Sequence, residues 1–161
     1  MFSIDKKFKN NKRRYIFQCA LVTISLSIVF SMLDLFFETG LVAALGATTF
    51  IVFTTPSKEI SRAHYIIGGY VIGAIVGLVL IYIAGFFPVW DQFFGAWAAL
   101  GVGLAMFLMV VLDFEHPPAA GVTLGLITDG GHLHSVLIAF LGIFAILLLR
   151  RLLAKWLIDL L

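Results

Sequence analysis

Apolar residues along this chain fall into long runs that basic residues interrupt at only three places. The first run covers residues 15–57 and the second covers residues 63–149, and neither contains a Lys or an Arg. A helix that rises 1.5 Å per residue needs about 20 residues to cross a hydrocarbon core about 30 Å thick. Four apolar segments reach that length, namely Tyr15–Phe37, His64–Phe87, Asp91–Leu112 and Leu133–Trp156.

Two further apolar segments, Thr39–Phe53 and Pro117–Thr128, are shorter than a comfortable span. They can cross only where the bilayer thins or where neighbouring helices enclose them. If both cross, the chain passes the membrane six times, and if neither crosses, it passes four times. Both counts place the two ends of the chain on the same side.

The basic residues distinguish the two counts, because loops on the cytoplasmic side carry an excess of Lys and Arg. All eleven lie in three patches, which are Lys6, Lys7, Lys9, Lys12, Arg13 and Arg14, then Lys58 and Arg62, then Arg150, Arg151 and Lys155. Six passes put every patch on one side and leave the outer connections with only the acidic residues Asp34, Glu38, Asp91 and Asp129. Four passes would expose the Lys58/Arg62 loop outside. We therefore predict an all-α protein of the inner membrane with four long and two short or broken helices and both termini cytoplasmic.

The order long, short, long occurs twice, which predicts an inverted repeat of three plus three segments with halves 15–88 and 89–161. The two short segments also share a local pattern, from Leu33 to Phe50 and from Leu112 to Leu124. Both begin Leu-Asp, reach a Glu, and continue through Ala-Ala to Gly-x-Thr. Inverted repeats with interrupted helices are typical of transporters, whose binding site lies near the midplane.

Composition limits the remaining possibilities. With 61% hydrophobic and 12% charged residues, the chain is a membrane domain at residues 15–161 behind a basic tail at residues 1–14. Its net charge of +2 comes from the ends and does not predict nucleic-acid binding. We expect the lipid bilayer as its partner, and a chain this small is a candidate for homo-oligomerisation around a pathway.

A single Cys excludes an internal disulfide. The sequence has no nucleophile elbow, phosphate loop or HExxH motif. We therefore expect that the protein is not an enzyme and that it has no metal site and no cofactor.

The sharpest motif begins at Glu115 and continues His116, Pro117, Pro118, Ala119, Ala120 and Gly121. Prolines suit the first turn of a helix, so the motif predicts a helix start inside the membrane or at its edge. The N–H groups that follow the prolines would be free to hold an anion, and His116 could donate a hydrogen bond or titrate. If the repeat is inverted, the matching start near Thr39–Gly40 should approach the same site from the other side. Carboxylates such as Asp113 and Glu115 are either interfacial helix ends or groups for proton coupling.

This motif resembles the HPP family of small integral membrane proteins, named for His-Pro-Pro, and the resemblance covers most of the chain. The other matching blocks are Gly46–Phe53, Pro56-Ser57, Arg62, Ile67-Gly68-Gly69 and Gly73. The chain departs from many relatives at Ser61, where they carry Pro, and at Tyr70, where they carry His. The resemblance implies a transport protein, and the family's plastid and cyanobacterial members are associated with nitrite uptake.

Glycines are regularly spaced in the third segment, where Gly69, Gly73, Gly77 and Gly85 share one helical face. Such faces allow helix backbones to approach closely in lipid, or they line a narrow path. Gly101, Gly121, Gly125 and Gly142 predict tight packing elsewhere.

Taken together, these features predict a transport protein for a small solute, most simply a nitrite-like inorganic anion, with proton coupling as an option. The expected site combines the seven motif residues with Thr48 and Thr123 of the two Gly-x-Thr elements, and with Arg62 as an inner gate. Arg62 could equally be a cytoplasmic anchor. The alternative function is a non-transporting membrane scaffold or accessory subunit, which needs only helix packing.

Overall fold

The computed structural model describes residues 6–33, 39–87 and 90–161, and this part of the chain is helical without a strand. The α-helices are α1 (Lys6–Leu33), α2 (Thr39–Thr54), α3 (Ala63–Ala84), α4 (Phe94–Val111), α5 (Pro118–Asp129) and α6 (Leu133–Leu153). Short 3₁₀ turns lie at Glu59–Ser61, Trp90–Phe93 and Ala154–Trp156. The predicted all-α fold is confirmed, and Asp34 and Glu38 lie outside the described residues.

Three of the four predicted long segments and both short ones occur as helices where the sequence predicts them, whereas the described part of Tyr15–Phe37 lies in α1 and is not among the candidate spans. Among the described residues, Ala63–Ala84, Phe94–Val111 and Leu133–Trp156 are long and apolar enough to cross a membrane, and Gly40–Thr54 is a shorter apolar helix. The 12 residues of α5 extend only about 18 Å. One difference is that α1 begins within the basic tail, at Lys6, with a non-helical residue at Asn11. Lys and Arg are good helix formers, so charge alone does not prevent helix formation there.

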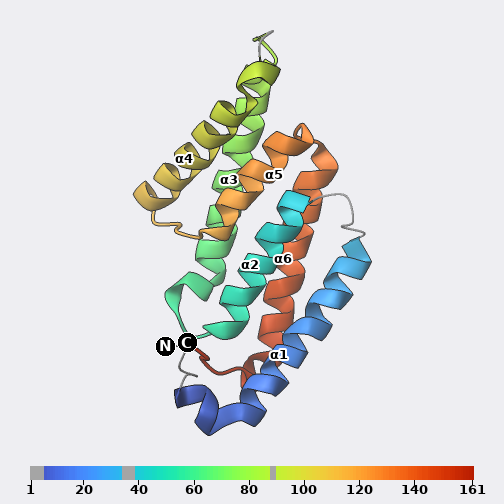
Figure 1. Cartoon of the computed structure of the whole chain (residues 1–161), viewed down its shortest axis with the longest axis vertical. Helices are drawn as coiled ribbons and strands as arrows, with labels where there is room; N and C mark the ends of the chain where they lie inside the picture. The colour runs from blue at the N-terminus through green and yellow to red at the C-terminus, as the bar shows by residue number, and fades with distance from the viewer. Residues whose placement is uncertain (1–5, 34–38, 88–89) are drawn as a thin grey trace.

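Successive helices run up and down the bundle, as Figure 1 shows. The start of α1, the loop at residues 55–62 and the end of the chain lie together at one end of the bundle, the lower end in Figure 1. We call this the basic end, because the three patches of Lys and Arg belong to these segments. The bundle therefore gathers its basic segments as a six-pass topology requires.

The short helix α5 is packed between α2, α3 and α4. Glycines make this possible, since a Cβ built on Gly73 would lie only 2.5 Å from the backbone oxygen of Ala119. A Cβ on Gly40 would lie 2.6 Å from the Cα of Gly125. The predicted glycine face is confirmed for Gly69, Gly73 and Gly77, which all meet α5, whereas Gly85 meets only carbonyls of its own helix. Backbone contact thus replaces side-chain packing around α5.

The helix contacts occur in pairs that an inverted repeat would produce. In such a repeat, α1 corresponds to α4, α2 to α5 and α3 to α6. The contact between α3 and α5 then corresponds to the contact between α6 and α2, and the contact between α3 and α4 corresponds to that between α6 and α1; all four are present. The α1–α2 contact likewise corresponds to α4–α5, and α2 packs directly on α5. The packing is compatible with the repeat, which stays a prediction.

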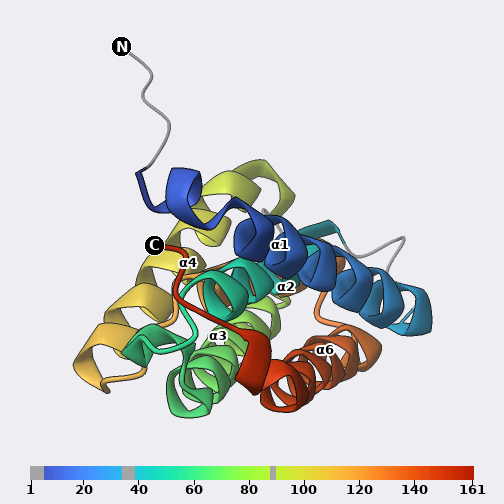
Figure 2. The same ribbon diagram turned by 90° about the horizontal axis from the view of Figure 1, so that it is seen from below.

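The chain closes the basic end with a segment that we call the C-terminal strap, residues 157–161. Figure 2 shows the C-terminus crossing beneath the helices at that end. The backbone N–H of Leu160 donates to the carbonyl oxygen of Thr54 at 2.7 Å. The side chain of Gln18, only 1% exposed, donates from Nε2 to the carbonyls of Phe53 and Ile158, and its Oε1 accepts from the Ile158 N–H at 3.2 Å. One buried amide thereby ties α1, α2 and the strap together.

Candidate functional site

The segment between α4 and α5 turns the chain back into the bundle. Helix α4 ends at Val111 with Leu112 as its C-cap, and Asp113 takes a positive φ of 57°, a left-handed conformation that Asp tolerates better than most residues. Phe114 then packs over Gly68, where a Cβ would lie 1.9 Å from the phenyl ring, and its ring centroid lies 4.7 Å from that of His64. This anchor places the HPP motif beside the first turns of α3.

The prolines start α5 as predicted, with Pro118 as its first residue. The N–H groups behind them, however, are not free. Ala119 donates to the carbonyl of His116 at 2.8 Å, and Ala120 donates to the carbonyl of Pro117 at 3.1 Å. The predicted anion nest at these two N–H groups is therefore wrong, because a tight turn of the motif itself satisfies both donors.

The polar centre of the motif is instead the His116 side chain, which is 1% exposed. Its Nε2 lies 3.0 Å from Oγ1 of Thr48 on α2, and that oxygen lies 2.9 Å from the hydroxyl of Tyr70 on α3. Thr48 and Tyr70 are both fully buried. Helices α2 and α3 and the segment before α5 thus contribute one side chain each to a buried hydrogen-bonded chain, which we call the His–Thr–Tyr chain.

The number of available donors favours one direction of hydrogen bonding along the His–Thr–Tyr chain. Tyr70 has one O–H donor, and its bond in the described structure is to Thr48. If Tyr70 donates to Thr48, then Thr48 donates to Nε2 of His116, and the imidazole proton resides on Nδ1. Nδ1 is buried and makes no hydrogen bond of normal geometry within the described residues, although the backbone of Ile60 lies near enough to interact with the ring. The His–Thr–Tyr chain therefore leaves the Nδ1 donor of His116 unused, near Ile60 of the loop at residues 55–62.

A small groove lies between the end of α4 and the motif. Its volume is about 120 Å³, and its walls come from the end of α4 and from the motif, namely Met106, Met109, Val110, Glu115, His116, Pro117 and Ala120. Glu115 and Asp113 are exposed at the bundle surface, whereas Pro118 and Ala119 are buried. The groove thus combines apolar side chains with one carboxylate and one imidazole.

The remaining predicted site residues separate into those near the motif and those apart from it. Thr123 is fully buried and donates from Oγ1 to the carbonyl of Gly73 at 3.0 Å, which joins α5 to α3. Gly121 packs against Ala44 of α2. Arg62 lies on the surface of the loop, where it forms an ion pair with Glu59 at 3.1 Å. The structure brings together His116 and Thr48, but it does not bring Arg62 to them.

The two helix starts do not converge either. Gly40, at the start of α2, packs against Gly125 near the far end of α5, while Thr48 meets His116. Because α2 and α5 run antiparallel along one another, their starts lie at opposite ends of the pair. The expectation that both starts approach one site is wrong.

Sequence reasoning missed the role of Tyr70, which joins the buried chain from α3. Its spacing was the available signal, because Tyr70 lies three residues before Gly73 and residues three apart are neighbours on a helix surface. A fully buried tyrosine also needs a partner for its hydroxyl.

Comparison with known families matches this chain over residues 8–159 to the model described as HPP, transmembrane region. Comparison with curated proteins and with solved structures gives no match.

Proposed function

The chain belongs to the HPP transmembrane family, and on that premise we propose that it transports a small solute across the inner membrane. The observation that carries the proposal is the His–Thr–Tyr chain, held by α2, α3 and the start of α5. Polar groups inside a membrane bundle are costly, and they commonly mark a pathway for ions, protons or substrates. Helix packing alone would not require three hydrogen-bonding side chains there.

We propose a small inorganic anion of the nitrite type as the solute. The neutral His116 imidazole keeps a hydrogen-bond donor at Nδ1, and its side chain lines the groove beside the motif. The adjoining groove of about 120 Å³ corresponds to the liquid volume of about four water molecules, which suits a solute of a few atoms. Glu115 on the same groove would repel an anion unless protonated, which favours uptake together with a proton.

The orientation that we propose places the basic end in the cytoplasm. The three patches of Lys and Arg belong to that end, and positive charge near the ends of spanning helices faces inward. In this orientation the HPP motif lies toward the cytoplasmic half of the bundle, beside the first turns of α3.

Flux of nitrite into proteoliposomes tests the proposal. We expect His116→Ala to lower the initial rate roughly ten- to a hundredfold, which corresponds to the loss of a hydrogen bond to a charged group. Glu115→Gln keeps the side-chain shape and should alter the dependence of the rate on pH. The exposed residue His134 provides a matched control, since His134→Ala removes the same group away from the motif.

The competing function, a membrane scaffold or accessory subunit, is favoured by one observation. The N–H groups of Ala119 and Ala120 are satisfied within the motif, so the prolines have a purely structural role in starting α5. Flux equal to wild type in both His116→Ala and Glu115→Gln, with folded protein in the bilayer, would favour the scaffold.

A further inference from the structure

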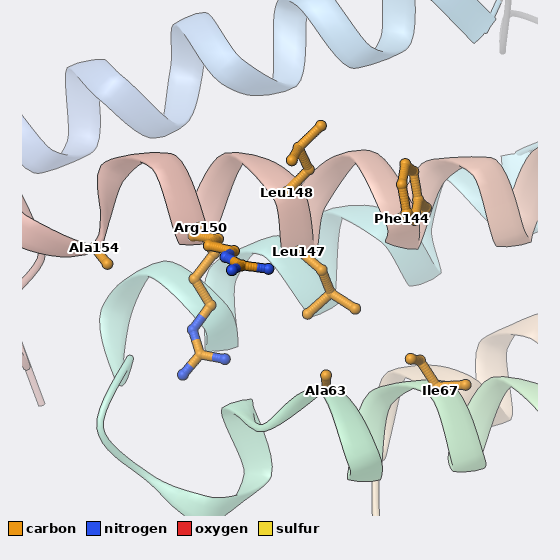
Figure 3. Close-up of a pocket in the computed structure, with 8 residues that line it drawn as sticks. Ala63, Ile67, Phe144, Leu147, Leu148, Arg150 and Ala154 are labelled. Atoms are coloured by element: carbon orange, nitrogen blue, oxygen red, sulfur yellow. The ribbon is translucent and has the colours of Figure 1, made fainter.

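A second cavity, independent of the HPP motif, lies between α3 and α6 at the basic end. The cavity is a groove of about 620 Å³, and Figure 3 shows the side chains that line it. Its apolar wall is formed by Ile67 on α3 and by Phe144, Leu147 and Leu148 on α6. Arg150 and Arg151 line the same groove, and none of its lining residues is acidic. From this combination we infer that the groove binds an anionic glycerophospholipid, such as phosphatidylglycerol.

The charged part of the groove lies where the helices leave the membrane. Ala63 is the first residue of α3, and Ala154 directly follows α6, so both frame the end at which the two arginines lie. Phe144 stands seven residues before Arg151 on the same helix, which is about 10 Å deeper at 1.5 Å per residue. A lipid headgroup at the arginines and an acyl chain toward Phe144 would follow this direction.

The arginines retain donors for a phosphate. Arg150 donates from Nη2 to the carbonyl of Pro56 at 2.6 Å, which uses one of the five N–H donors of a guanidinium. That bond directs the Arg150 side chain toward the loop that precedes α3. Arg151 is exposed in the last turn of α6. Paired guanidinium groups suit phosphate oxygens because each can donate two parallel hydrogen bonds.

The apolar wall favours a lipid over a free anion. Ile67, Phe144 and Leu148 are 44%, 65% and 46% exposed, so the wall opens sideways toward the acyl chains that surround a spanning helix. A free phosphate would contact the arginines and gain nothing from this wall. Basic pockets between membrane helices are known to hold anionic headgroups, and the groove has both of the required parts.

Native mass spectrometry of the purified full chain with phosphatidylglycerol or phosphatidylcholine tests the inference. We expect phosphatidylglycerol to bind in preference, and Arg151→Gln to weaken its binding roughly fivefold, the effect of one basic residue near an anionic headgroup. Lys155→Gln is the matched charge control, because Lys155 lies one turn further on and does not line the groove. Ala63→Phe should fill the groove and reduce binding further, whereas Ala99→Phe, at an exposed position of α4, should not.

Equal binding of the two lipids would overturn the inference. So would an equal loss in Arg151→Gln and Lys155→Gln, which would indicate diffuse attraction, or displacement of the lipid by millimolar inorganic phosphate. Because Arg151→Gln leaves the Arg150–Pro56 bond in place, it should yield folded protein even if Ala63→Phe does not. Nitrite flux has no part in this assay, so its result is independent of the proposed transport function.

Discussion

The contact between Gly73 and α5 gives the most direct test of how this bundle is assembled. In Gly73→Ala, the added Cβ would lie 2.5 Å from the backbone oxygen of Ala119 and 3.2 Å from Oγ1 of Thr123. The first neighbour is backbone, so it can yield only if the two helices move apart. That movement would also lengthen the 3.0 Å hydrogen bond from Thr123 to the Gly73 carbonyl.

The expected destabilisation follows from these two effects. Overpacking by one methyl group costs about 1–3 kcal/mol, and weakening one hydrogen bond costs about 1 kcal/mol. Alanine is a better helix former than glycine by about 1 kcal/mol, which offsets part of the sum. A net loss of about 2 kcal/mol corresponds to a fall in Tm of roughly 4–8 °C for a chain of this size.

Thermal unfolding of the detergent-purified protein, followed by the loss of monodisperse material, measures this change. Gly103 provides the matched control, since a Cβ built there meets nothing within 4 Å, and Gly103→Ala should keep or slightly raise the Tm. Gly73→Leu should abolish accumulation of folded protein. If Gly73→Ala is as stable as Gly103→Ala, α3 and α5 do not pack through their backbones and the glycine face has another purpose.

Three further outcomes are expected. Gln18→Leu should lower the Tm by several degrees, because it strands the buried carbonyl of Phe53 and the part-buried N–H and carbonyl of Ile158, at about 1–3 kcal/mol for a buried unpaired group; an unchanged Tm would mean that the strap is not held through this amide. Tyr70→Phe should lower the Tm by about 2–4 °C through loss of the bond to Thr48, whereas a rise would show that the hydroxyl is poorly satisfied. Reporter enzymes fused to either terminus should be active only in the cytoplasm, and periplasmic activity of either fusion would reverse the proposed orientation.

Much of the fold could be predicted because the membrane imposes strong rules on sequence. Runs of apolar residues fixed the segments, and α3 and α6 lie within three residues of the predicted bounds. The glycines at 69, 73 and 77 were correctly placed against a neighbouring helix, since spacing by four residues defines one helical face. These are local properties that require no knowledge of the partner.

The site was harder to predict, because its geometry depends on which helices meet. His116 and Thr48 were both singled out, and they do meet. Arg62 was grouped with them by motif alone, but it forms an ion pair with Glu59 on the surface. The proline motif predicted a helix start correctly and free N–H groups wrongly, since the sequence does not specify that His116 and Pro117 offer their carbonyls to that turn. Gln18 was overlooked, although a lone amide in an apolar helix is costly without a partner.

The partners of Gln18 also set an order on the biogenesis of this chain. Its amide hydrogen-bonds to Ile158, which the ribosome adds 140 residues later. Until residue 158 emerges, the Gln18 amide of α1 is incompletely paired, at a cost in apolar surroundings that favours lateral mobility of the helix or temporary pairing with other polar groups. Closure of the basic end therefore waits for residue 158, and a nascent chain halted before that residue should leave α1 accessible to insertion factors and quality-control proteases that no longer reach it once the bonds to Ile158 form.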